Sequence, residues 1–283
     1  MTFKRFFLSV MTVFFADGLF CAEFSDYEKN IIEQIQEFRF FTRAIQSADE
    51  AVSKIAEYRT SFLTADVRKN LSEEAELTAD NLLILEQYNY MYEAAPKSPE
   101  LEPFIKAQYE KIDAYNAAHE QAECNPYYVL SSGDLINSTM QFLPQGTAIK
   151  LGLQEKKNYD AVVANYPDFA FGLINAALWY YFAPAIGGGS NTKAHSYFSR
   201  AVECASNNYE KFYASVYYSQ FLFENNDSEA CEKYLSQAES LLPNNRWTLL
   251  IRRMNKLSYS VLDYSNNREK IDRKLEEKGI SKN

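Results

Sequence analysis

The sequence predicts an all-α protein, and three observations lead to this fold class. The chain of 283 residues contains only 9 glycines and 8 prolines, so residues that interrupt helices are scarce. No glycine occurs between Gly18 and Gly133, and no proline precedes Pro96. Apolar residues recur at steps of three and four, which is the period of a helix and not of a strand. Since 47% of the residues are hydrophobic, the chain is also able to bury a sizeable core.

Residues 1–22 have the features of a secretory signal peptide. Lys4 and Arg5 form a basic start, an apolar run over residues 6–15 follows, and small residues come after it. The run is too short for a permanent transmembrane helix, so we expect a protein exported to the periplasm or cell envelope. Cys21 allows lipid anchoring, but Phe20 argues against it because the residue before a lipidated cysteine is normally small.

An N-terminal helical region is expected over residues 23–125. Residues 27–60 carry a stripe of apolar side chains at helical spacing. The segment from Ser47 to Glu50 has the form of a capping box, so we expect the stripe to break into two helices there. Residues 72–94 repeat the helical pattern.

The first firm linker is the segment Pro96-Lys97-Ser98-Pro99. Ser98 is expected to cap the next helix, with Pro99 as its first residue, because proline is favoured at that position. This helix is expected to run to about Gln121. A second break is expected at residues 124–127, where Pro126 lies.

Residues 126–265 repeat a pattern of small and large side chains. A small, a large and a second small residue, separated by three and two positions, occur at Ala194, Phe198 and Ala201, and again at Cys231, Leu235 and Ala238. Small side chains on one face let a neighbouring helix approach closely. The spacing resembles the second helix of a tetratricopeptide repeat, a family of stacked antiparallel helix hairpins. That family has a small residue in each first helix, and the matching positions here are Ala177 and Ser219.

The repeat pattern stops near the C-terminus. Arg253 stands where the next small residue is expected, so we interpret the helix over residues 246–262 as a terminal cap without a packed neighbour. Residues 266–283 are rich in charged side chains and poor in apolar ones. We expect them to form a charged, solvated and partly frayed tail.

A closer resemblance lies in residues 166–198. This segment combines the run Pro-Asp-Phe-Ala-Phe-Gly, a pair of tyrosines, the glycines at 187–189 and a Lys-Ala pair. It looks like the T component of tripartite ATP-independent periplasmic (TRAP) transporters. The resemblance implies an exported or lipidated protein built of degenerate tetratricopeptide-like hairpins. It also implies that the partner is a periplasmic solute-binding protein, and that a ligand is bound as well.

Composition and motifs argue against several other function classes. A net charge of −9 disfavours nucleic acid as a partner, because phosphate binding needs a basic face. The sequence contains none of the common hydrolase, metalloprotease, nucleotide-binding or redox motifs, so we expect neither an enzyme nor a cofactor. His119 and His195 are interpreted as surface histidines and not as metal ligands. Cys124, Cys204 and Cys231 are interpreted as unpaired thiols, although a bridge between the last two stays open.

The glycine run before residue 190 has two interpretations. Gly188, Gly189 and Ser190 precede a helix, and free N–H groups at a helix start are able to hold an anion. The alternative is an enlarged turn between paired helices, in which glycine supplies a positive φ.

An aromatic groove is expected on the inner surface of the repeats, where the first helices of the hairpins lie. Its predicted residues are Phe171, Ile174, Leu178, Tyr181, Phe182, Tyr213, Val216, Gln220, Phe223, Trp247, Leu250 and Met254. Three interpretations stay open for this surface: it is covered by the N-terminal helices, it binds a protein or peptide, or it encloses a hydrophobic small molecule. A generic envelope scaffold and a homo-oligomer are also compatible with the sequence.

Overall fold

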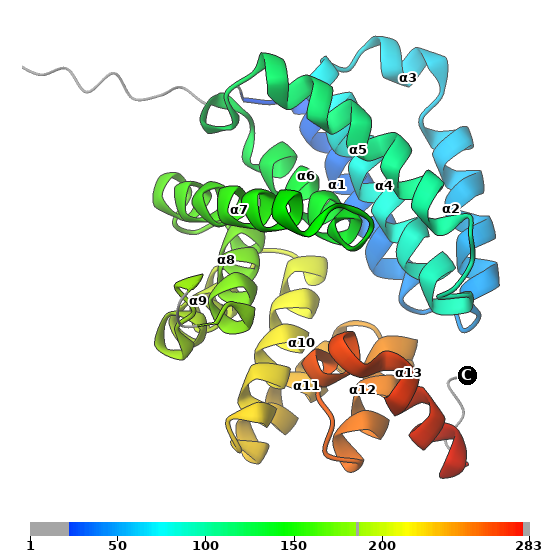
Figure 1. Cartoon of the computed structure of the whole chain (residues 1–283), viewed down its shortest axis with the longest axis vertical. Coiled ribbons are helices and arrows are strands. Elements are labelled where there is room, and N and C mark those ends of the chain that lie inside the picture. Colours follow the sequence, from blue (N-terminus) through cyan, green and yellow to red (C-terminus); the bar gives the residue numbers. More distant parts are fainter. Residues whose placement is uncertain (1–22, 185–186, 280–283) are drawn as a thin grey trace, which may run out of the picture.

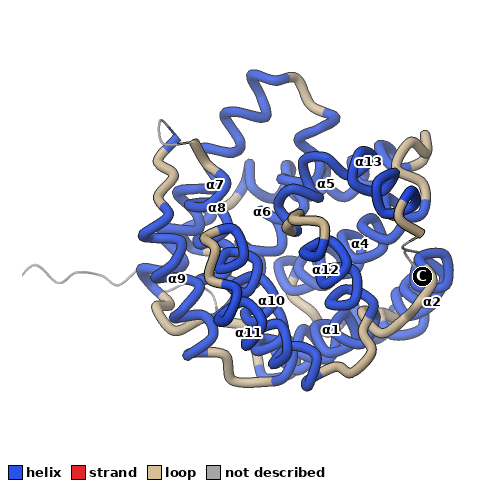
Figure 2. The backbone as a smooth tube through the Cα atoms, turned by 90° about the horizontal axis from the view of Figure 1, so that it is seen from below, coloured by secondary structure: helices blue, strands red, loops and turns tan. Residues whose placement is uncertain are grey.

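The computed structural model confirms the all-α fold class. It describes residues 23–184 and 187–279, and within them it contains thirteen α-helices, two short 3-10 helices and no strand (Figures 1 and 2). The predicted signal peptide and Cys21 lie outside the described residues. None of the helices in the described ranges combines the length and the apolar character that a bilayer-spanning segment needs.

Five helices form the N-terminal region. They are α1 (Asp26–Thr42), α2 (Ala48–Phe62), α3 (Ala65–Lys69), α4 (Glu73–Ala94) and α5 (Leu101–Ala118). Helix α4 packs against α1, α2 and α5, so it is the central helix of this region. Most of its side chains are buried, on all sides of the helix.

The predicted break in the first helical stripe is confirmed. Helix α1 ends at Thr42, and α2 begins after Ser47, whose hydroxyl accepts a hydrogen bond from the Glu50 N–H. The predicted start of α5 is wrong. This helix begins at Leu101 after Glu100, and Ser98 instead accepts a hydrogen bond from the Glu100 N–H in the preceding turn.

The rest of the chain continues as helices joined by short turns. They are α6 (Pro126–Thr139), α7 (Gln145–Asn165), α8 (Ala170–Phe182), α9 (Asn191–Cys204), α10 (Asn208–Glu224), α11 (Ser228–Leu241), α12 (Arg246–Lys256) and α13 (Val261–Glu277), with the 3-10 helices at Gln121–Glu123 and Met140–Phe142. Helices α8 and α9 form one closely packed hairpin, and α10 and α11 form the next (Figure 1).

Slim side chains hold these hairpins together, as predicted. Ala177, Ala194, Ala201, Ser219 and Ala238 are all fully buried. Between the two alanines of α9, Phe198 is buried against α10, where its ring contacts Tyr218 and Phe221. The predicted contact faces of the hairpins are therefore the observed ones.

The C-terminus differs from the expected frayed tail. Helix α12 ends at Lys256, and the separate helix α13 packs beside it instead of leaving α12 as the last helix. Ile271 and Leu275 of α13 are fully buried, so the charged sequence around them is the outer face of a docked helix. The helix also reaches the N-terminal region, where Glu269 pairs with Lys97.

The N-terminal region covers the inner surface of the repeats. The Phe40 ring of α1 packs edge-on against Phe212 of α10, with 5.2 Å between ring centroids. At the end of α1, the carbonyl of Arg43 accepts a hydrogen bond from the Arg246 N–H at 2.9 Å. Both regions contribute to one large core cluster. At these positions the geometry agrees with one of the three interpretations of the groove, coverage by the N-terminal helices.

Candidate functional site

A chamber lies between the two regions of the protein, at the covered surface. The chamber has a volume of about 300 Å³. Helices α1, α4 and α6 form its walls on one side, and α8 and α10 form them on the other. Its polar and aromatic lining includes Gln36, Arg39, Arg43, Asn89, Tyr127, Ser131, Asp134, Asn137, Asn175, Tyr213 and Tyr217.

Helical spacing explains why these side chains converge. Gln36, Arg39 and Arg43 lie three and four residues apart, so α1 presents all three on one face. Phe171, Ile174 and Leu178 have the same spacing on α8. Each wall of the chamber is therefore one face of one helix, and its shape follows from how these helices pack.

A buried carboxylate holds the two arginines in place. Glu86 of α4 is fully buried, and one of its oxygens accepts from Arg39 Nε at 3.3 Å and from Arg43 Nη2 at 3.0 Å. Its other oxygen accepts from the Thr42 hydroxyl at 2.8 Å. Two cations one helical turn apart repel each other, and this shared anion compensates them.

Arg43 is also enclosed by aromatic rings. Its guanidinium lies 5.2 Å from the Trp247 ring centroid and 5.7 Å from those of Tyr90 and Tyr213, which are cation–π distances. Its Nε donates to the Tyr213 hydroxyl at 3.2 Å. Burial alone would lower the pKa of Arg43, but Glu86 and the two phenols raise it well above its ordinary value. This side chain is therefore a fixed positive charge.

The opposite charge comes from α6. Asp134 accepts a hydrogen bond from Asn175 Nδ2 of α8 at 3.1 Å. Burial raises the pKa of Asp134 to about 6, and Arg39 and the Asn175 hydrogen bond oppose this rise. The chamber is thus lined by two guanidinium groups, which both pair with the Glu86 carboxylate, and by one carboxyl group whose pKa burial raises to about 6.

The structure brings four of the twelve predicted groove residues to the chamber. Phe171, Ile174, Leu178 and Tyr213 line it. Trp247 lies just behind it, where its ring contacts Tyr213.

The other seven predicted residues lie away from the chamber. Val216, Leu250 and Met254 belong to the buried core. Gln220 is also buried, and its side-chain oxygen accepts a hydrogen bond from the Val261 N–H at the start of α13. Tyr181 donates a hydrogen bond to Glu224, and Phe223 packs in the cluster around Phe198. Phe182 is exposed. The surface expected to form one aromatic groove is therefore divided into core, chamber and rim.

The glycine run forms a turn in which three backbone donors are used internally. The N–H groups of Gly187 and Gly189 donate to the Pro184 carbonyl, and that of Ser190 donates to Tyr180. Gly188 has a φ of +89°, and a side chain on Gly189 would collide with the Ala183 carbonyl. These observations agree with the enlarged-turn interpretation, and they add no support to the anion contact.

The histidines and cysteines have local roles. The exposed His119 ring stacks on Tyr115, and His195 makes a hydrogen bond with the Tyr218 hydroxyl. Cys204 and Cys231 are free thiols, and the Cys124 thiol donates to the Glu120 carbonyl at 3.5 Å. Within the described ranges, no group of three or more His, Cys, Asp or Glu side chains is arranged to hold a metal ion.

The charged residues of the chamber were not predicted from the sequence. Arg39 and Arg43 stand beside the apolar stripe of α1, and their partner Glu86 is more than 40 residues away in the chain. The one available signal is the spacing of two like charges one helical turn apart, which is unfavourable without a nearby anion.

The side chains that line the chamber are suited to binding and orienting a molecule. It places fixed charges, amide groups and tyrosine hydroxyls around a small volume, which is the composition of a site that orients a polar molecule. No protein-family model matches this sequence, and no curated protein matches it significantly.

Proposed function

We propose that the protein is a non-enzymatic binding protein that holds a small molecule in the chamber. The observation that carries this proposal is the convergence of Arg39, Arg43, Asp134 and Asn175 on a partly open volume of about 300 Å³. That volume is at the lower end of the range for small-molecule sites. Because the cations and carboxyl groups balance, the ligand that fits best is a small neutral or zwitterionic molecule with an apolar part against Phe171 and Leu178.

Native mass spectrometry of protein purified from its own cells tests this proposal. The protein should retain a small molecule, which denaturation releases. Leu178→Trp places a large ring in the chamber and should abolish the retained mass, whereas Leu153→Trp on the exposed face of α7 should not. Thermal denaturation of both variants checks that they fold. Bare protein mass in every sample would contradict the ligand.

The partner proposal rests on different support. The resemblance of residues 166–198 to TRAP T components suggests a periplasmic solute-binding protein as the partner. We propose that the rim of the repeats forms the contact, because Phe182 lies in this segment and is 47% exposed. An aromatic side chain at the centre of an interface commonly contributes about 2 kcal/mol.

Capture from the native envelope tests the partner. A solute-binding protein should be retained by the wild-type chain and less by Phe182→Ala, with no change in melting temperature. Phe41→Ala is the matched control, since Phe41 is exposed to a similar extent on α1. Capture of unrelated envelope proteins by all three proteins would favour the generic scaffold instead.

A further inference from the structure

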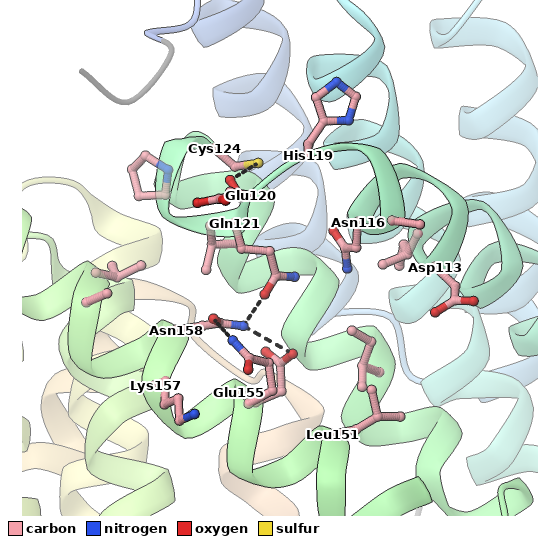
Figure 3. A pocket seen from close by; sticks show the side chains of 18 of the residues that line it. Asp113, Asn116, His119, Glu120, Gln121, Cys124, Leu151, Glu155, Lys157 and Asn158 are labelled. Carbon is pink, nitrogen blue, oxygen red and sulfur yellow. Dashed lines mark hydrogen bonds between the residues drawn. The ribbon is translucent and has the colours of Figure 1, made fainter. Parts of the chain in front are cut away.

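A second and larger cavity lies between α5, α6 and α7, and we name it the α7 cavity. Its volume is about 700 Å³. Apolar side chains such as Ile112, Val129 and Leu151 form much of its wall, and Gln121, Asn158 and Glu155 form a polar part (Figure 3). Its size is within the range of sites for small molecules.

The polar part contains a buried carboxyl group that lacks adequate partners. Glu155 is 1% exposed. One of its oxygens accepts a single long hydrogen bond, from Asn158 Nδ2 at 3.4 Å. The other oxygen has no hydrogen-bond partner within the described residues. A buried carboxylate without compensation is strongly unfavourable.

The fold makes room for this carboxyl group. A side chain at Gly133, in the middle of α6, would meet Glu155 Oε2 and the Tyr159 hydroxyl well inside van der Waals contact. A glycine inside a helix costs about 1 kcal/mol relative to alanine. Helix α6 therefore carries an unfavourable residue at the one place where Glu155 needs space.

The charges around Glu155 do not compensate it. Within the described residues Glu155 forms no ion pair, since the adjacent Lys156 pairs with Asp160, and the neighbouring Asp134 carboxyl has the same sign as Glu155. Burial raises the pKa of Glu155 to about 7, and Asp134 adds to the effect, while the Asn158 hydrogen bond opposes it. The charged side chains at the rim are Asp113, Glu120, Lys150 and Lys157, and His119 lies beside them; all five are exposed.

We propose that the α7 cavity binds a small organic cation, an amine with an apolar body, whose ammonium group pairs with Glu155. The ammonium supplies the counter-charge that the protein itself lacks at this position. The body of the amine lies against the apolar wall, where its burial adds to the binding free energy. This site is separate from the chamber and does not depend on the function proposed for it.

Isothermal titration calorimetry at pH 8 tests the proposal with defined probes. The amines are butylamine, cadaverine and phenethylamine, and the controls of similar shape are neutral 2-phenylethanol and anionic 3-phenylpropionate. At least one amine should bind at a single site in the millimolar range or tighter. The neutral and anionic controls should bind at least tenfold more weakly. If no amine binds, or if phenethylamine and 2-phenylethanol bind equally, the proposal is wrong.

A pair of variants locates the binding. Glu155→Gln keeps the size of the side chain and removes its charge, so amine binding should weaken at least tenfold. Glu120→Gln removes an exposed rim charge and should change the affinity less than twofold. Melting temperatures establish that both variants are folded. Unchanged amine affinity in Glu155→Gln would overturn the assignment, whatever the chamber binds.

Discussion

Two buried glutamates, Glu86 in the N-terminal region and Glu155 at the start of the repeats, differ in the hydrogen-bond partners that their carboxyl groups have. Glu86 in α4 accepts hydrogen bonds from Arg39, Arg43 and Thr42. Glu155 in α7 has one long hydrogen bond from an amide. Both side chains are buried to the same degree.

This difference teaches that burial alone does not determine the state of a carboxyl group. A buried carboxylate that is paired with cations becomes part of the structure, because breaking the pair is strongly destabilising. Without them, burial favours the protonated form, and the group then responds to pH or to an arriving cation. We expect Glu86 to act as a structural anchor and Glu155 to act as a responsive group.

The largest effect is expected for Glu86→Gln. The substitution leaves Arg39 and Arg43 in the core without their anion, and breaking a buried ion pair costs about 3–5 kcal/mol. Chemical denaturation measures the loss in free energy of unfolding. Glu57→Gln, at an exposed position of α2, should change it by less than about 0.5 kcal/mol. A loss below about 1 kcal/mol for Glu86→Gln would contradict the role of Glu86 as a structural anchor.

The pH dependence of stability gives the next largest effect. The pKa of Glu155 is raised in the folded state, from an ordinary value of 4.5 to about 7, so the folded state binds more protons within this window. The contribution of Glu155 to the free energy of unfolding is fully present below pH 4.5 and is lost as the pH rises through 7. The loss is about 3 kcal/mol. Denaturation midpoints at pH 5 and pH 8 should therefore differ more in the wild-type protein than in Glu155→Gln, and parallel curves would contradict the assignment.

Gly133→Ala should have an intermediate effect. Its methyl group displaces the Glu155 carboxyl or the Tyr159 ring, and overpacking of this kind costs about 1–3 kcal/mol. Gly146→Ala is the matched control, because nothing lies within 4 Å of the added atom and alanine favours the helix. Thermal denaturation compares the two. A second substitution, Glu155→Ala, should restore part of the loss if the carboxyl group is what the methyl displaces.

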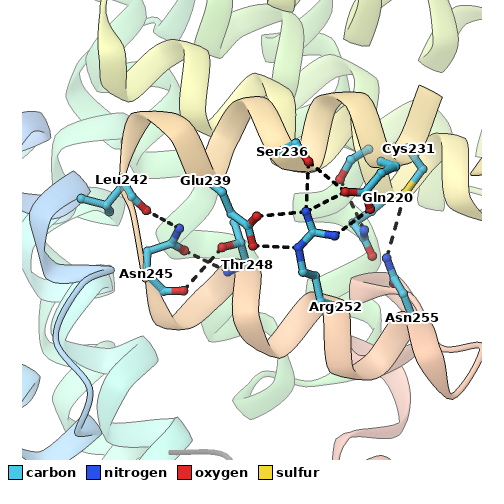
Figure 4. A network of polar contacts seen from close by, with 11 residues as sticks. Gln220, Cys231, Ser236, Glu239, Leu242, Asn245, Thr248, Arg252 and Asn255 are labelled. Carbon is cyan, nitrogen blue, oxygen red and sulfur yellow. Dashed lines mark hydrogen bonds and ion pairs between the residues drawn. The ribbon is translucent and has the colours of Figure 1, made fainter. Parts of the chain in front are cut away.

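The smallest effect is expected at an ion-pair network that solvent reaches. Arg252 of α12 donates to Glu232, Ser236 and Glu239 of α11 (Figure 4). Its side chain is 27% exposed, so Arg252→Ala should cost less than about 1 kcal/mol, and less still in high salt. A loss in free energy of unfolding as large as that for Glu86→Gln would contradict the prediction that the exposed network stabilises the fold less than the buried one.

Local signals explain how much of the fold was predictable from the sequence. Ser47 and Pro126 mark helix starts by their own chemistry, and the small residues at Ala194 and Ala201 mark a contact face by spacing alone. Such signals lie within one or two helical turns, and the structure agrees with these four residues. Ser98 and Pro99 gave a signal of the same kind that failed, because α5 begins only at Leu101.

Features that depend on distant partners were not predictable in this way. Helix α13 has only a few apolar side chains among many charges, and its docking is visible only once Ile271 and Leu275 are seen buried. The chamber needs Arg43 to meet Glu86 and Tyr213, which lie on three separate helices. No periodicity within α1 indicates which distant residues complete the site.

The position of Trp247 beside the Arg43 guanidinium has a practical consequence. The sequence contains only two tryptophans, and Trp179→Phe would leave this indole as the single one. Its fluorescence would then report whether α1 is seated on the repeats, since release of α1 removes the nearby charge and hydrates the ring. A red shift of emission that precedes global unfolding would show the first helix leaving before the hairpins open.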